Sequence, residues 1–175
     1  MIRQRLLILL ASSFLTACGA PEDDGSLGRF EVTAERTQSC GDAGLLGSAS
    51  AMSYVVHLRR VGETALHWDD GSEVLMLALD PDGISFMLRR TQSFDMRLGG
   101  EAPEAPPCFI ERRDELDGVL EGTEAEGFEG FAGTLHYAFA PLSGSSCADL
   151  LQGPEPIATA MPCTIGYALS AERAH

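Results

Sequence analysis

The sequence of 175 residues contains no lysine and no asparagine, and all twelve of its basic residues are arginine. Without asparagine the chain has no acceptor for N-linked glycosylation. Because lysine and asparagine have AT-rich codons, we interpret their joint absence as the mark of a high-GC genome. Acidic residues number 26, so the net charge is −14. A surface of this sign repels nucleic acid and anionic membranes, and we predict no nucleic-acid partner.

Common motifs of catalysis and cofactor binding are also missing. The chain has no Gly-x-Ser-x-Gly, His-Glu-x-x-His, P-loop or dinucleotide-binding glycine pattern. Its four histidines are scattered, and no two carboxylates are spaced as a defensible acid and base. The aspartates at 69, 70, 80 and 82 lack the spacing of a calcium loop, so we assign them to turns. We therefore predict a protein that is not an enzyme and that holds no metal or cofactor.

The longest apolar run near the N-terminus is Leu6–Leu15, which follows Arg3 and Arg5. It is too short for a membrane-spanning helix, which needs about 20 apolar residues, and is typical of a cleaved secretory segment. The run ends in Leu15-Thr16-Ala17-Cys18, which resembles the lipobox of bacterial lipoproteins.

This resemblance implies that residues 1–17 are a signal peptide and that Cys18 receives lipid as the first mature residue. Several acyl chains, palmitate among them, would give stable membrane anchoring, since each buried CH₂ contributes about 0.8 kcal/mol. Gly19 stands where Asp would retain an enteric lipoprotein at the inner membrane, so we expect the outer membrane. Residues 18–28 are rich in Pro, Gly, Asp and Ser and read as a flexible tether, which leaves 29–175 as one folded domain.

Once Cys18 is assigned to lipid, Cys40, Cys108, Cys147 and Cys163 remain, an even number in an oxidising compartment. Two disulfides are expected, and four cysteines allow three connectivities. We predict Cys147–Cys163, because this pair would bracket a short helix and the strand after it. Cys40–Cys108 then follows by exclusion. A zinc site is disfavoured, since no Cys-x-x-Cys occurs.

Short segments of alternating or continuous apolar residues recur along the domain, separated by turn signals. A helix is expected only near 146–152, where Ser146 can cap its start and Gly153-Pro154 would end it. Val74–Leu79 is apolar throughout and is interpreted as a buried strand. Glycines at 127, 130 and 133 indicate bends in a strand. Strands are expected at 30–34, 52–61, 64–68, 74–79, 84–88, 108–120, 135–139 and 165–169.

About eight short strands with little helix predict an all-β, antiparallel fold. We favour a closed up-and-down barrel, similar in size to lipocalins, with a β-sandwich as the alternative. The Gly-x-Trp pattern that lipocalins carry early in the chain is missing, because the single tryptophan is Trp68. The mature domain is therefore not assigned to a family.

Two functional interpretations follow from the predicted barrel interior. Tyr54, Phe86, Tyr137 and Tyr167 are expected on one inward face. A solid core would bury these rings together and suit a structural or interaction module of the cell envelope, whereas a hollow barrel would bind a small ligand between them.

Arg60 and Arg90 each continue the inward phase of an apolar run, so we expect them at the barrel mouth. There they would bind the anionic head of an amphiphile or pair with nearby carboxylates. The expected partners are thus the membrane, through the lipid on Cys18, and either an envelope protein or a small amphiphilic ligand.

Overall fold

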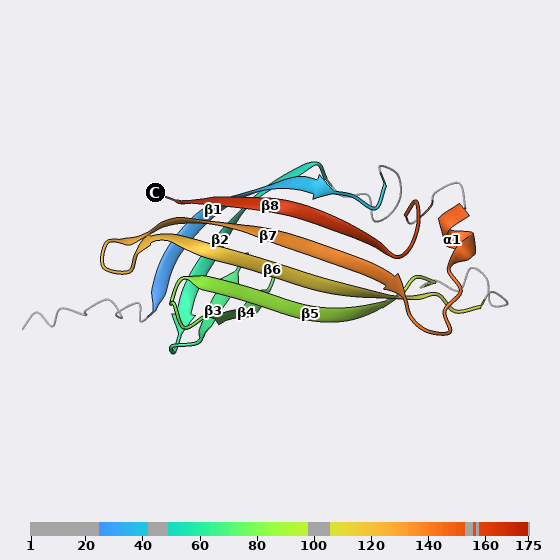
Figure 1. The fold of residues 1–175 in the computed structure, drawn as a ribbon, viewed down its shortest axis with the longest axis horizontal. Coiled ribbons are helices and arrows are strands. Elements are labelled where there is room, and N and C mark those ends of the chain that lie inside the picture. The colour runs from blue at the N-terminus through green and yellow to red at the C-terminus, as the bar shows by residue number, and fades with distance from the viewer. Residues whose placement is uncertain (1–24, 42–48, 98–105, 153–155, 157, 175) are drawn as a thin grey trace, which may run out of the picture.

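The computed structural model describes residues 25–41, 49–97, 106–152, 156 and 158–174, which form a closed antiparallel barrel of eight strands and one short helix (Figure 1). Each strand pairs with the next in sequence, and β8 closes the barrel against β1. This confirms the up-and-down barrel over the sandwich. The elements are β1 Ser26–Gln38, β2 Ala51–Val61, β3 Ala65–Asp69, β4 Val74–Leu79, β5 Ser85–Asp95, β6 Phe109–Thr123, β7 Gly127–Pro141, α1 Ala148–Gln152 and β8 Cys163–Arg173.

Strand β1 begins at Ser26, inside the tether that the sequence predicts to run to Gly28. The rest of that tether, the signal peptide and Cys18 lie outside the described residues. Helix α1 falls within the predicted 146–152. In the described ranges, no helix is long and apolar enough to cross a membrane.

Strand β4 corrects one expectation. Its bounds match the predicted 74–79, but Val74 and Met76 are 60% and 62% exposed, so only one face is buried. In an antiparallel barrel alternate residues point outward, and an unbroken apolar run does not change that geometry. The apolar outer face of β4 is therefore a surface feature and not part of the core.

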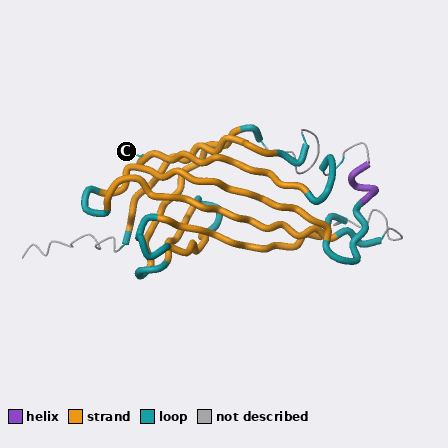
Figure 2. The backbone as a smooth tube through the Cα atoms, viewed as in Figure 1, coloured by secondary structure: helices purple, strands orange, loops and turns teal. Residues whose placement is uncertain are grey.

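The two ends of the barrel differ. The "turn end" carries the short β2–β3, β4–β5 and β6–β7 connections, the start of β1 and the end of β8; the "loop end" carries the β1–β2, β5–β6 and β7–β8 connections (Figures 1 and 2). β6 and β7 have 15 residues each, whereas β3 and β4 have 5 and 6. At about 3.3 Å per residue, the β3–β4 wall is about a third as tall as the β6–β7 wall.

Strands β4 and β5 also share few paired positions on this side of the barrel. β4 and β5 pair at only two positions, Ala78 with Met87 and Leu79 with Phe86, whereas β5 and β6 pair from Ser85 to Asp95. Beyond those two positions β5 continues toward the loop end without β4 beside it. The barrel wall is therefore incomplete on one side, between the β3–β4 turn and the loop end.

The half of the barrel nearer the turn end is packed solid with aromatic rings. Phe131 lies at the centre, with ring centroids of Trp68, Phe86 and Phe30 at 5.4, 5.6 and 5.7 Å. Such tilted and edge-on pairs contribute beyond the area that they bury. Phe86 lies opposite Gly118 on β6, where any Cβ would collide with the Phe86 ring. The glycine therefore makes the room in which this ring packs.

Arginines close the turn end. Arg173 donates from Nε to the Phe128 carbonyl and from Nη2 to the Leu27 carbonyl, both at 2.7 Å, and its guanidinium lies 5.9 Å from the Phe30 ring centroid. Arg60 donates to the Gly83 carbonyl at 3.0 Å and to Glu124 at 3.1 Å. Arg173 thus links β8 to β7 and β1, and Arg60 links β2 to the β4–β5 and β6–β7 turns.

Both disulfides lie toward the loop end, but their pairing differs from the prediction. The structure joins Cys40 to Cys163 and Cys108 to Cys147, so Cys147–Cys163 and Cys40–Cys108 are wrong. Cys40 follows β1 and Cys163 begins β8, and closure of the barrel brings these two strands side by side with Gln38 opposite Gly166. Cysteines far apart in sequence thereby become neighbours.

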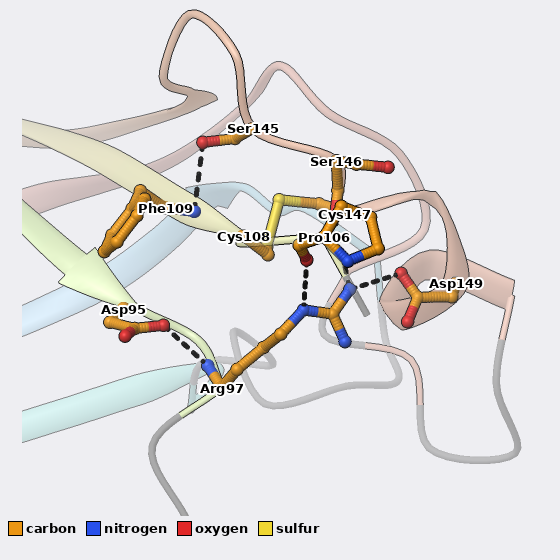
Figure 3. Close-up of a disulfide and its surroundings, with 9 residues drawn as sticks. All are labelled: Asp95, Arg97, Pro106, Cys108, Phe109, Ser145, Ser146, Cys147 and Asp149. Atoms are coloured by element: carbon orange, nitrogen blue, oxygen red, sulfur yellow. Dashed lines mark hydrogen bonds and ion pairs between the residues drawn. A yellow bond between two sulfur atoms is a disulfide. The ribbon is translucent and has the colours of Figure 1, made fainter. Parts of the chain in front are cut away.

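The second disulfide fastens the start of β6 to the segment that leads into α1 (Figure 3). Arg97, just after β5, reinforces this junction. Its guanidinium donates to the Pro106 carbonyl and to the Asp149 carboxylate, each at 2.8 Å. The hydrogen bond from Arg97 lowers the pKa of Asp149. Covalent and ionic contacts thus join the end of β5, the start of β6 and the segment at α1 among the described residues of the loop end.

Candidate functional site

A pocket of about 240 Å³ lies inside the barrel, on the loop-end side of the aromatic cluster and beside the gap between β4 and β5. Typical small-molecule pockets measure about 300–1,000 Å³, so this one suits a small ligand or one end of a longer ligand. Its walls come from six strands and the β3–β4 turn. The lining residues are Met52, Tyr54, Trp68, Asp70, Glu73, Leu75, Leu88, Arg90, Asp114, Leu116, Leu135 and Tyr137.

One side of the pocket is a buried ionic network centred on Asp114, which is only 2% exposed. Arg112 donates to its two carboxylate oxygens, at 2.6 Å from Nε and 2.8 Å from Nη2. Arg90 adds a hydrogen bond from Nε to Oδ2 at 3.0 Å and an ion-pair contact of Nη2 at 2.9 Å. A buried carboxylate needs such partners, because desolvation without them costs several kcal/mol. Both carboxylate oxygens of Asp114 therefore have arginine partners.

The network continues to both sides of Asp114. Arg90 Nη1 donates to Glu73 at 2.8 Å, and this ion pair spans the gap where β4 and β5 are not joined. Arg112 Nη2 donates to the Gln92 side-chain oxygen at 2.6 Å. The Arg112 guanidinium also lies 5.3 Å from the Phe94 ring centroid and 5.0 Å from that of Tyr137. The barrel thus already holds one cation against aromatic rings.

The β3–β4 turn places two carboxylates at the pocket mouth. Asp70 Oδ1 accepts hydrogen bonds from the Ser72 hydroxyl and from the backbone N–H groups of Ser72 and Glu73, at 2.7, 2.8 and 3.1 Å. The Ser72 hydroxyl bond is the main cause of a lowered Asp70 pKa. Asp70 is therefore ionised at neutral pH, and the turn holds it in place.

Two tyrosines, Tyr54 on β2 and Tyr137 on β7, also line the pocket. Burial raises the pKa of Tyr54 to about 12, with smaller contributions from Tyr137 and Asp70. Burial likewise raises the pKa of Tyr137, followed by the charge of Asp114. Both phenols are therefore neutral over the physiological range and offer ring faces and hydroxyl groups to the pocket.

The structure brings together only some of the residues proposed from sequence. Tyr54, Arg90 and Tyr137 line the pocket. Phe86 belongs to the solid aromatic cluster instead. Tyr167 is buried behind Tyr137, with ring centroids 6.5 Å apart, and donates to the Ala49 carbonyl at 3.4 Å.

The expectation that Arg60 and Arg90 share one mouth is wrong. Arg60 lies at the turn end beside Glu124 and lines a different cavity with Arg173. Arg90 lines the pocket beside the aromatic cluster, where its three donor nitrogens face Glu73 and Asp114. Both guanidiniums pair with carboxylates, the other outcome that the sequence left open.

Three important residues were not proposed from the sequence: Asp114, Arg112 and Trp68. Ile110, Arg112, Asp114 and Leu116 alternate along one phase of β6, and this pattern carries charge into an otherwise apolar inward face. A charged pair at two successive inward positions signals a buried ionic network. Trp68 shares the inward phase of Leu66 on β3.

Two other candidate metal ligands, Asp69 and Asp82, accept hydrogen bonds within their own turns. Asp69 accepts from the Gly71 N–H at 2.9 Å, and Asp82 accepts from the Ile84 and Ser85 N–H groups at 2.9 and 2.8 Å. Among the residues that the structure describes, no three histidine, cysteine or acidic side chains are arranged to hold a metal ion. These aspartates therefore act as turn residues.

Comparisons of the chain with protein family models, with curated proteins and with solved structures give no match.

Proposed function

We propose that this protein is a lipid-anchored barrel of the bacterial cell envelope that binds a small, partly apolar ligand. The observation that carries the proposal is the pocket above the aromatic cluster, where Leu75, Leu88, Tyr54 and Tyr137 leave about 240 Å³ unfilled beside a gap in the barrel wall. The pocket opens to solvent, and its lining of apolar and aromatic side chains with a few charged groups is the composition of small-molecule sites.

The anchor supports the envelope location. Leu15-Thr16-Ala17-Cys18 behind Arg3 and Arg5 resembles the lipobox of bacterial lipoproteins, and Gly19 in that pattern favours the outer membrane. Gly25 is seven residues beyond Cys18, a stretch that spans at most about 25 Å. In this proposal the turn end lies near the membrane, and the pocket opens between the turn end and the more distant loop end.

Replacing the proposed lipidation site should release the protein from the membrane. We expect the full-length protein to enter the detergent phase on phase separation and the Cys18→Ser variant to remain in the aqueous phase. A Ser13→Ala variant, which changes the leader without touching the cysteine, is the matched control. Equal partitioning of the wild type and Cys18→Ser would rule out the anchor and leave the pocket proposal to stand separately.

Filling the pocket should abolish ligand binding. Three probes share a benzyl group and differ in charge: benzyltrimethylammonium, benzyl alcohol and phenylacetate. We expect at least one of them to show saturation transfer from the full-length protein in dodecyl maltoside, and Leu88→Trp to remove that signal. Val119→Trp places the same ring on the outer face of β6, where Val119 is exposed, and should keep it.

If no probe signal depends on Leu88→Trp, the pocket is not a ligand site. The protein would then be better described by the other interpretation, a structural or interaction module.

A further inference from the structure

In the pocket, carboxylate groups are more available to a ligand than guanidinium groups are. Among the described residues, Asp70, Glu73 and Asp114 line the pocket together with a single cation, Arg90. Arg90 uses Nε and Nη2 on Asp114 and Nη1 on Glu73, so an anionic ligand would have to displace a carboxylate to reach it. Arg112, the other cation nearby, binds both oxygens of Asp114. Both guanidiniums therefore already have a carboxylate partner, and Arg112 does not line the pocket.

The carboxylates at the mouth are only half used. The hydrogen bonds from Ser72 and Glu73 to Asp70 all go to Oδ1, and Arg90 donates to Glu73 at Oε2, so no donor from another described residue reaches Asp70 Oδ2 or Glu73 Oε1. The turn between β3 and β4 holds both side chains at the pocket. A group that donates hydrogen bonds or carries positive charge meets two free acceptors there.

The rings add a second, independent attraction for a cation. Tyr54 and Trp68 contact each other with centroids 6.5 Å apart, and both line the pocket with Tyr137. The negative faces of such rings attract ammonium and guanidinium groups within about 6 Å of the centroid. Tyr137 and Phe94 already hold the Arg112 guanidinium in this way. The net charge of −14 also draws cations toward the protein from a distance.

We propose that the ligand is an organic cation: an ammonium or guanidinium group lies at the mouth between Asp70, Glu73 and the Tyr54 ring, and its apolar part lies against Leu75, Leu88 and Trp68. This inference rests on the proposed function and specifies its ligand class. It replaces the anionic headgroup expected from the sequence, because Arg60 and Arg90 do not meet and both are paired.

The test compares the three benzyl probes on the full-length protein in dodecyl maltoside, read by the fluorescence of Trp68, the single tryptophan. We expect benzyltrimethylammonium to bind at least tenfold more tightly than benzyl alcohol and phenylacetate to bind weakest. Asp70→Asn with Glu73→Gln should weaken the ammonium probe at least tenfold and change benzyl alcohol binding by less than twofold.

Asparagine at 70 keeps the oxygen that caps the turn, so the fold is preserved. Asp82→Asn is the control, because Asp82 also accepts from the backbone N–H groups two and three residues further on and from a serine hydroxyl, but lies outside the pocket. It should leave all three affinities unchanged.

The outcomes separate the two proposals. If benzyl alcohol or phenylacetate binds at least as tightly as the ammonium probe, or if Asp70→Asn with Glu73→Gln leaves the ammonium affinity unchanged, the cation inference is overturned and the binding pocket stands. If none of the three probes binds, both fall.

Discussion

Asp114→Ala is expected to lower the free energy of unfolding by about 3 kcal/mol. The substitution leaves Arg90 and Arg112 facing each other inside the barrel with no carboxylate between them. Removing one partner of a buried ion pair costs about 3–5 kcal/mol. We expect the lower end of that range, because the side chains of Arg90 and Arg112 are 23% and 25% exposed and reach some solvent. Urea-induced unfolding followed by Trp68 fluorescence measures the change.

Asp117→Ala is the matched control on the same strand. Asp117 pairs with Arg89 at 2.9 Å, but its side chain is 48% exposed on the outer face of the barrel. An exposed pair contributes at most about 1 kcal/mol. Equal losses at Asp114 and Asp117 would mean that the buried network has no special energetic role.

A second variant distinguishes the energetic cost of an unpaired buried charge from the cost of lost hydrogen bonds. Asp114→Leu combined with Arg112→Met removes more hydrogen bonds than Asp114→Ala but leaves only Arg90, which still has Glu73. Replacing a buried ionic group with apolar side chains is often neutral or stabilising. We expect the double variant to be more stable than Asp114→Ala, and the reverse order would contradict this account of the network.

The sequence predicts the barrel because the information for it is local. In an antiparallel barrel inward and outward residues alternate along each strand, as in Met52–Val61, so the strand can be recognised from its own sequence. Short turns then make neighbouring strands pair. The one short helix also carries its signals locally, in Ser146 and Gly153-Pro154. The β4 segment shows the limit, since an apolar run does not say whether its outer face is covered.

The candidate site was predicted less well, for a reason that strand direction explains. In an up-and-down barrel successive strands run in opposite directions, so β2 ends at the turn end and β5 at the loop end. Arg60, near the end of β2, and Arg90, at the middle of β5, therefore lie at different heights along the barrel. The inward phase of both residues was right, and only their position along the barrel axis was missed.

The pairing of the cysteines depends on closure, which no short segment encodes. A pairing rule based on nearness in sequence favours Cys147 with Cys163. The barrel instead brings the end of β1 to the start of β8, across a separation of 123 residues. Only the decision that the sheet closes on itself identifies Cys40 and Cys163 as neighbours.

Removing the Cys40–Cys163 disulfide is expected to destabilise the protein more than any other change considered. Closing a loop of 123 residues contributes about 5 kcal/mol in the chain-entropy model, because the crosslink restricts the unfolded chain. We expect Cys40→Ala with Cys163→Ala to lose about that amount in urea-induced unfolding. Alanine is the better replacement, since Cys40 is buried and a serine hydroxyl there would need a partner.

The double variant Cys108→Ala with Cys147→Ala is the matched comparison, because it removes the same atoms from a loop of 39 residues. The same model gives about 4 kcal/mol for that loop. The order of the two losses follows from topology: one bridge fastens the β1–β8 seam that closes the barrel, and the other fastens the segment before α1 to β6. Non-reducing peptide mapping should recover Cys40 with Cys163. A Cys147–Cys163 peptide, or a larger loss from the shorter loop, would contradict the closure that this pairing requires.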